Sequence, residues 1–220
     1  MVDNILRARE PCAFHDTTMI HYQEYQPSAE EILAFEQEQR AAKLITVGET
    51  GWPCAGAYPF LRSGDVLEMH LVRTDEQVRH LETRSIASIL IDEVLSSVPS
   101  HWFGSMATHA DQLHRTVCYE CEATVIRETT EIRRHLVDLL ARYQPQADFV
   151  PLNHPDYAAQ LRAICLVRLQ PVRVTAKFKL GQKLNRRDRE MLVENLEKRE
   201  RVEDVATITA MNSFAARRGG

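Results

Sequence analysis

From Val174 to Lys198 the sequence reads VTAKFKLGQKLNRRDREMLVENLEK. Around its first half, apolar residues alternate with polar ones: Val172, Val174, Ala176, Phe178 and Leu180 are separated by Arg173, Thr175, Lys177 and Lys179. This alternation predicts a β-strand with one apolar and one cationic face. Gly181 ends the pattern, and a helix is predicted from about Asn185 to Arg201. The cationic face either is simply solvated or holds an anion such as phosphate.

The overall composition is that of an ordinary globular protein. The chain has 220 residues, of which 44% are hydrophobic and 26% charged, so we expect one domain or a domain with appendages. No apolar run approaches the roughly 18 residues that a membrane span needs. The N-terminus lacks the apolar core of a signal peptide, and we therefore expect a cytoplasmic protein.

The charges are distributed unevenly. After residue 170 there are 12 Lys and Arg against 7 Asp and Glu, whereas the preceding residues carry 15 against 24. A basic C-terminal part can meet an anionic cofactor, a nucleic acid or the acidic body of a second subunit. The overall pI of about 6.1 argues against nucleic-acid binding by the whole domain.

Five cysteines are few and odd in number, as in a reducing compartment. Cys118 and Cys121 have CxxC spacing, but they lie in a run of strand composition, where residues three apart point to opposite faces. No second pair completes a zinc site. We interpret them as ordinary strand cysteines.

The strand and helix signals favour a mainly β fold with added helices. The predicted strands are Leu44–Val47, Pro53–Leu61, Val66–Val72, Ile86–Ile91, Thr116–Ile126 and Ala163–Leu180. The short connections among the first three favour antiparallel hairpins, and six mostly antiparallel strands with few helices between them suggest a small barrel. Capping boxes at Ser28–Glu31 and Thr74–Gln77 predict two helices, and the apolar spacing from Ile132 to Tyr143 predicts a third.

We expect four parts in the chain. They are an irregular segment at 1–26, a barrel domain at 27–182, a helix at 183–204 packed on the barrel or on a partner subunit, and a mobile tail at 205–220.

Three regions could carry chemistry. The small residues of Cys54–Pro59 admit a flat ligand or, alternatively, mark tight packing. Glu68–Thr74 leads into a helix whose N-terminus attracts anions, unless that helix is simply a capped structural one. The third region is the cationic strand face, with Arg115 as a further contributor. The group of His101, His109 and His114 with Asp111 fits no standard metal spacing and is interpreted as surface loop.

Several of these segments resemble known motifs. KFKLGQ at Lys177–Gln182 resembles K-x-K-L-S-Q, HLVRTDEQVRHL at His70–Leu81 resembles H-x-A-x-x-N-P-Q-W-R-x-L, and PSHWF at Pro99–Phe103 resembles P-S-W-Y. Arg115–Val117 is similar to an R-S-V strand. In this order, between roughly Ile32 and Lys198, the chain resembles the FMN-binding split-barrel superfamily (pyridoxamine-phosphate-oxidase-like), most of all its PaiB-type branch of FMN-binding negative transcriptional regulators. Asp75–Glu76 replaces the Asn-Pro of that branch, and Gly181 its Ser.

The resemblance implies a six-stranded antiparallel Greek-key split barrel that forms a homodimer, with FMN in a cleft at the subunit interface. The residues that it assigns to the cofactor site are Tyr58, His70, Arg73, Thr74, Gln77, Arg79, Trp102, Arg115, Lys177 and Gln182. Among these, it places Arg73, Thr74, Arg79 and Lys177 near the phosphate, and Tyr58, His70, Trp102 and Gln182 near the ring system.

The function that follows from the resemblance is that of an FMN-binding flavoprotein, as an oxidoreductase acting on a small molecule. One alternative is a PaiB-like regulatory or binding protein without catalytic turnover. Another is a haem-binding split barrel in which a histidine ligates the iron. Direct contact with DNA is not expected, because the sequence has no helix-turn-helix signal.

Overall fold

The computed structural model describes residues 23–146 and 148–217. Most of the segment 1–26 therefore lies outside the described residues, and its last part forms a short 3-10 helix, η2 (Gln23–Tyr25). Helix α1 (Ala29–Glu38) begins at the predicted capping box: the Ser28 N–H donates to Glu31 Oε2 at 2.6 Å, and the Glu31 N–H donates to Ser28 Oγ at 3.2 Å.

Seven strands form one sheet in the order β2-β1-β5-β6-β7-β4-β3. Their bounds are β1 Ala41–Val47, β2 Pro53–Pro59, β3 Leu61–Ser63, β4 Val66–Val72, β5 Ile86–Val98, β6 Asp111–Ile126 and β7 Ile164–Lys179. The pairings of β1 with β2 and β5, and of β4 with β3 and β7, are antiparallel, as expected. The mainly β fold with added helices is thus confirmed.

The expected count of six strands is wrong, because the segment Pro53–Leu61 is two strands. β2 pairs with β1 up to Pro59, whereas β3 starts at Leu61 and pairs with β4. Proline has no N–H to continue a ladder. The chain thus leaves one edge of the sheet at Pro59 and joins the other at Leu61. Phe60, between them, has a fully buried side chain.

The chain divides into two compact units. Of the described residues, unit 1 holds Gln37–Ile91 and Cys118–Thr175, and unit 2 holds the remaining segments, which are 23–36, Asp92–Val117 and 176–217. In unit 1, β2 at one edge of the sheet lies close to β4 near the other edge, so the sheet curls around an apolar interior. Leu67, Met69 and Leu71 of β4 point into that interior and are almost fully buried.

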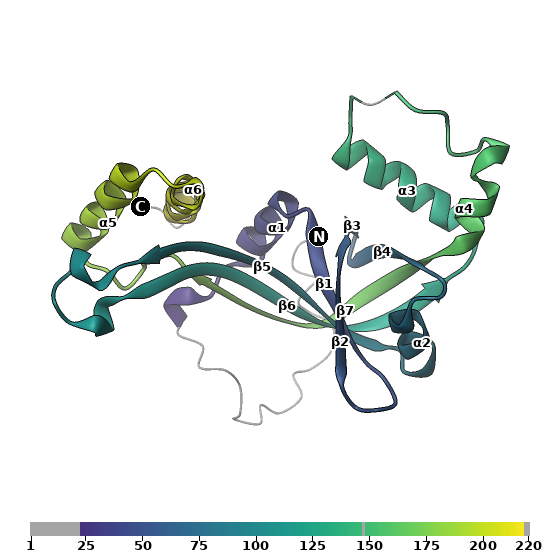
Figure 1. Ribbon diagram of the computed structural model, residues 1–220, viewed down its shortest axis with the longest axis horizontal. Coiled ribbons are helices and arrows are strands. Elements are labelled where there is room, and N and C mark those ends of the chain that lie inside the picture. The colour runs from purple at the N-terminus through teal and green to yellow at the C-terminus, as the bar shows by residue number, and fades with distance from the viewer. Residues whose placement is uncertain (1–22, 147, 218–220) are drawn as a thin grey trace. The chain divides into compact units, whose positions relative to one another are not determined.

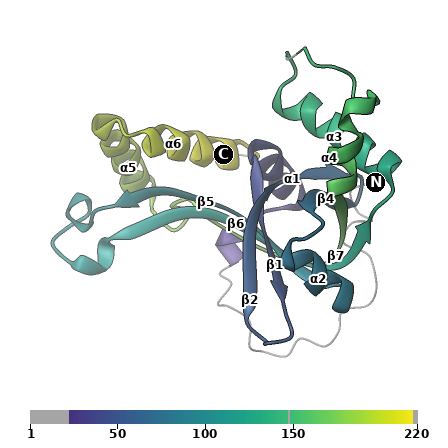
Figure 2. The ribbon, with the colours of Figure 1, turned by 45° about the vertical axis from the view of Figure 1, so that its right-hand side comes forward.

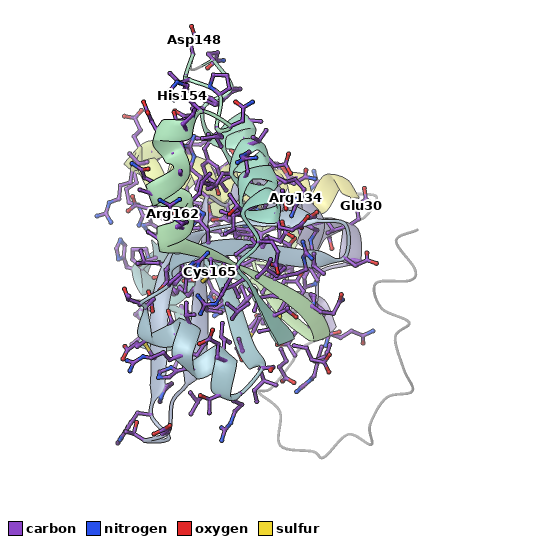
Figure 3. The ribbon with its side chains drawn as sticks, turned by 90° about the vertical axis from the view of Figure 1, so that its right-hand side faces the viewer. Glu30, Arg134, Asp148, His154, Arg162 and Cys165 are labelled. Atoms are coloured by element: carbon purple, nitrogen blue, oxygen red, sulfur yellow. The ribbon has the colours of Figure 1, made fainter. Side chains whose placement is uncertain are left out.

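Helices of unit 1 cover the outer face of β4 and β7. Helix α3 (Thr129–Tyr143) and the short helix α4 (Ala158–Ala163) lie side by side next to the start of β7 (Figures 1 and 3). Ile132 of α3, Leu161 of α4 and Leu166 of β7 form a buried apolar cluster between them. The predicted helix at Ile132–Tyr143 is confirmed, whereas α4 was not predicted.

The expected start of the second helix is shifted by one residue. Helix α2 (Glu76–Thr83) is capped by Asp75, whose carboxylate accepts the Gln77 N–H at 2.9 Å, and not by Thr74. A carboxylate at this position satisfies free N–H groups and complements the helix dipole.

In unit 2, helix α5 (Arg186–Arg199) confirms the predicted C-terminal helix, and Asn185 is its N-cap. The mobile tail at 205–220 is wrong for most of its length, because α6 (Val202–Arg217) is helical. Asp204 and Thr207 of α6 are buried and bond to Ser96 of β5, at 2.6 and 2.9 Å. These polar contacts fix α6 in unit 2. No helix among the described residues has the length and apolar character for a membrane crossing.

Candidate functional site

A cleft of about 830 Å³ opens in unit 1 between the turn that joins β1 to β2 and the outer side of α2. Figure 2 shows the hairpin of β1 and β2 with α2 beside it. We call it the hairpin cleft. The cationic, hydroxyl and aromatic side chains that line it are Thr50, Trp52, Arg79, His80, Thr83 and Arg84, and its acidic ones are Glu49, Glu76 and Glu82.

The hairpin cleft depends on Gly48. A Cβ atom on Gly48 would lie 2.4 Å from His80 Nε2, so only a glycine lets the imidazole pack against the turn. Thr46 holds the ring from the other side, with its Oγ1 3.0 Å from His80 Nδ1. Gly51 closes the turn with φ of 81°, which favours glycine.

The cations of the hairpin cleft are available to a ligand. Among residues 23–146 and 148–217, no side-chain hydrogen bond or ion pair engages Arg79 or Arg84. Two of the three acids are engaged: Glu82 pairs with Arg127 at 2.5 Å, and Glu76 accepts a hydrogen bond from the Cys54 thiol at 3.0 Å.

The surroundings of Cys54 favour the protonated thiol. The hydrogen bond to Glu76, with burial and the charges of Glu76 and Asp75, raises the pKa of the thiol to about 11. Trp52 stands at the rim of the hairpin cleft with 78% of its surface exposed. The cleft therefore offers two free guanidinium groups and an exposed aromatic face, which suit a flat anionic ligand.

The start of α2 is occupied by the protein's own side chains. The Tyr58 hydroxyl lies 3.0 Å from Asp75 Oδ2 and 2.7 Å from Gln77 Oε1. The buried Gln77 amide donates to the Leu44 and Cys54 carbonyl oxygens at 3.0 and 3.2 Å. Burial, together with Asp75, raises the pKa of Tyr58 to about 12, so the hydroxyl keeps its proton.

The missing side chain at Gly56 leaves room for the contact between Tyr58 and Gln77, and not for a ligand. A Cβ atom there would lie 2.5 Å from the Tyr58 hydroxyl and 2.6 Å from Gln77 Oε1. Of the two interpretations of Cys54–Pro59, tight packing is the one that the structure supports. An anion cannot reach the N-terminus of α2 without displacing Asp75.

Three further residues assigned to the cofactor lie elsewhere in unit 1. His70 of β4 packs beneath α3, with its Nδ1 3.3 Å from His135 Nε2. Arg73 donates to the backbone oxygens of Ile164 and Arg127, at 2.8 and 3.1 Å, which is a structural role. Thr74 is exposed.

The remaining four assigned residues belong to unit 2. Trp102 is covered by the Arg199 guanidinium, 4.9 Å from the ring centre. Arg115 is nearly buried and pairs with Glu93 at 2.6 Å. Lys177 Nζ lies 5.8 Å from the centre of the Tyr25 ring. Gln182 bonds to the backbone at both ends of its own turn, accepting from the Leu180 N–H at 2.7 Å and donating to the Phe178 oxygen.

The structure thus brings Tyr58 and Gln77 into contact and places Arg79 in the hairpin cleft. For all ten residues, cofactor binding stays a prediction. Sequence reasoning missed Trp52, His80 and Arg84. The available signal was the Gly48-Glu-Thr-Gly51 turn followed directly by Trp52, because a turn places the side chain that follows it near the surface.

The described cysteines lie on strands and do not gather with histidines. Cys118 and Cys121 are free thiols on β6, one half-buried and one buried, which confirms their interpretation as strand cysteines. Within the described parts of the chain, no three His, Cys, Asp or Glu side chains come together as metal ligands.

Comparisons with known proteins point to one group. Residues 19–173 match the model of a family described as "Putative FMN-binding domain". A search of the curated proteins gives no match.

Solved structures with the same fold include a conserved hypothetical protein from Mycobacterium tuberculosis, 17% identical with a TM-score of 0.59, in an alignment covering 76% of this chain and 94% of that one. The flavocytochrome Anf3 from Azotobacter vinelandii is 17% identical with a TM-score of 0.64, covering 80% of this chain and 79% of its own. An FAD and heme binding protein from Mycobacterium smegmatis is 18% identical with a TM-score of 0.62, covering 76% and 79%.

Proposed function

Because the chain belongs to the putative FMN-binding domain family of the split-barrel, pyridoxamine-phosphate-oxidase-like superfamily, we propose that it is a flavoprotein whose hairpin cleft holds FMN. The family match over residues 19–173 is the observation that carries this proposal, and FMN is the cofactor that membership indicates.

The hairpin cleft fits FMN in size and chemistry. Its volume of about 830 Å³ is within the range of about 300–1,000 Å³ that small-molecule sites have. Arg79 and Arg84 would bind the phosphate by charge-assisted hydrogen bonds. The exposed indole of Trp52 offers a stacking surface to the ring system.

The chemistry that bound FMN supplies is electron and hydride transfer. The role of the chain's own residues is to bind and orient the cofactor. Tyr58, with its pKa raised to about 12, and Cys54, with its pKa raised to about 11, both stay protonated near the cleft at neutral pH. We propose an oxidoreductase acting on a small molecule, with a PaiB-like regulatory role without turnover as the alternative.

A homodimer is part of the proposal. β7 lies inside the sheet between β6 and β4, yet Gln170 and Val172 on one face of the strand and Arg173 on the other are exposed. Val172 in particular is 56% exposed. A second copy packed against this strand would cover Val172. Light scattering of the wild type and of Val172→Lys would test this, with a shift from dimer to monomer expected in the variant.

The test of the cofactor is an absorption spectrum of the purified protein with and without added FMN. We expect flavin bands that co-elute with the protein on a desalting column. A chain without flavin absorbance that also leaves added FMN unbound would overturn the proposal. A Soret band on adding haem, without flavin binding, would favour the haem-binding alternative.

The test of the position uses Trp52 fluorescence. In a Trp102→Phe background Trp52 is the remaining tryptophan of the chain, and FMN stacked on it should quench its emission. Quenching that is saturable in Trp102→Phe and weakened by Arg79→Gln supports the hairpin cleft. FMN bound in the absorption test without any quenching of Trp52 would place the cofactor elsewhere.

A further inference from the structure

Beneath α3, on the other side of β4 from the barrel interior, six side chains form one connected polar cluster. These are Glu68 and His70 of β4, Glu131, Arg134 and His135 of α3, and Arg168 of β7, and we call them the Glu68 network. Glu68 is 1% exposed and His135 is fully buried. None of these contacts is needed for the proposed flavin site.

The carboxylate of Glu68 is the centre of the Glu68 network. It accepts hydrogen bonds from Arg134 at 2.7 and 2.8 Å and from Arg168 at 2.9 Å. Burial opposes its ionisation, but the interactions with His135, Arg134 and Arg168 outweigh burial and lower the pKa of Glu68 to about 2. The group is therefore an anion at every pH at which histidine titrates.

The two histidines are placed so that their protons are coupled. His135 Nδ1 lies 3.6 Å from Glu68 Oε2, and His135 Nε2 lies 3.3 Å from His70 Nδ1. A proton on His135 Nδ1 faces the carboxylate, whereas a lone pair there would be repelled by it. His135 Nε2 then accepts the hydrogen bond, and His70 Nδ1 donates it.

This arrangement tolerates one added proton and not two. With one extra proton on either ring, the contact at 3.3 Å still has a donor and an acceptor. With both rings protonated, two N–H groups face each other and the hydrogen bond is lost. The second proton also enters a site where Arg134 and Arg168 are already cationic.

The charged groups around the histidine pair come from three elements. Among the described residues they are Glu68 from β4, Arg168 from β7, and Glu131, Arg134 and Asp138 from α3. Of these, Glu68 alone is a buried anion, so a second added proton places a further positive charge beside the fully buried His135 that no second buried carboxylate offsets.

We propose that the His70–His135 pair, backed by Glu68, is an acid-triggered latch that holds α3 on the sheet of unit 1 and releases it when both rings are protonated. The expected loss of stability toward acid pH agrees with the direction of the pKa shift of His70. Burial and the neighbouring His135 lower the pKa of His70 below its ordinary 6.5. A lowered pKa means that the stabilisation is complete above pH 6.5 and is lost as the pH falls through the lower value of the folded protein.

Hydrogen exchange of the α3 amides, at about pH 7.5 and about pH 5 and expressed as protection factors, tests the latch. In the wild type we expect α3 to lose about tenfold or more of its protection at the lower pH, and α2 to lose much less. His70→Gln can still donate to His135 but cannot titrate, so its α3 should lose less than about threefold.

His154→Gln is the matched control. His154 also faces a carboxylate, Asp156 at 3.4 Å, but it lies in the exposed loop beyond α3 (Figure 3). This variant should behave as the wild type. A wild-type α3 that keeps its protection at the lower pH, or a His70→Gln variant that loses as much as the wild type, would overturn the latch.

A titration of the wild type by NMR keeps the proposal testable if His70→Gln loses α3 at neutral pH. The His70 ring resonance should titrate below pH 6.5, together with a change in the α3 amide signals. Two independent histidine titrations near the ordinary value, with α3 unchanged, would contradict the latch.

Discussion

The hairpin cleft and the Glu68 network both bring arginine and glutamate side chains together in unit 1. The arginines of the network are paired with a carboxylate, whereas those of the cleft are unpaired within the described parts of the chain. In the network, Arg134 and Arg168 converge on one carboxylate that is 1% exposed. In the cleft, Arg79 and Arg84 are exposed, and no described side chain pairs with them. A buried carboxylate paired with two arginines holds the fold, whereas arginines left open beside an aromatic ring are free to bind.

The energetic consequences of the two arrangements differ in kind. Removing one partner from a buried ion pair leaves the others uncompensated and costs about 3–5 kcal/mol. Removing an exposed and unpaired arginine changes the free energy of unfolding by less than about 0.5 kcal/mol. Substitutions in the network should therefore act on stability, and substitutions in the cleft on affinity for the ligand.

Glu68→Gln should have the largest effect. It removes the anion between Arg134 and Arg168, and we expect a loss of about 3 kcal/mol in the free energy of unfolding, measured in urea. Glu120→Gln is the control, because the pair of Glu120 with Arg173 is exposed and should cost less than about 1 kcal/mol. Equal losses in the two variants would contradict the comparison.

The second largest effect should be the pH dependence of stability that Glu68 causes. The pKa of Glu68 is lowered from 4.5 to about 2, so its contribution to stability is complete above pH 4.5 and is lost as the pH falls toward 2. Urea denaturation between these pH values should show the wild type losing stability more steeply than Glu68→Gln. Parallel curves would show that Glu68 titrates normally.

The double substitution Arg79→Gln and Arg84→Gln tests the hairpin cleft. Loss of two charge-assisted contacts, each about 1.5 kcal/mol, should weaken FMN binding about a hundredfold, as measured by fluorescence titration. The urea midpoint should stay that of the wild type. The exposed Arg186 of α5 supplies the control, Arg186→Gln, which should leave FMN affinity unchanged. An unchanged affinity in the double variant would rule out phosphate binding in this cleft.

Gly48→Ala should have the smallest effect. The new Cβ would lie 2.4 Å from His80 Nε2, so the ring must move and its contact with Thr46 is lost, at about 1 kcal/mol. Gly51→Ala is a useful contrast, because its strain comes from a φ of 81° and no atom lies within 4 Å of the added Cβ. Only Gly48→Ala should shift the His80 ring resonances by NMR.

Much of the fold follows from local patterns. The Ser28–Glu31 capping box and the apolar spacing of α3 each depend on a few adjacent residues, and both predictions are confirmed. The helix α6 was missed because Asp204 and Thr207 occupy its buried face, and their partner Ser96 is distant in the sequence. Polar residues on a buried helix face disguise the apolar period.

The candidate site was also harder to predict, because its contacts join residues that are distant in the sequence. Gln77 matches a family motif, but its role here is set by the carbonyl groups of Leu44 and Cys54 on other strands. His135 lies three residues after Ile132, on the same helix face, and that spacing was the one local sign that it faces the sheet. Its coupling to His70 depends on tertiary packing.

The break at Pro59 and Phe60 also makes β2 and β3, the two edges of the sheet, a single covalent run. Their registers are thus not independent: Leu61 can face Glu68 only if Pro59 faces Ala41. Deleting or inserting one residue at this junction would turn the side chains of a whole edge strand to the opposite face. The number of residues at this junction is therefore fixed by the pairing of both edge strands. The protein should tolerate substitution of Phe60 by other large apolar residues better than any insertion or deletion there.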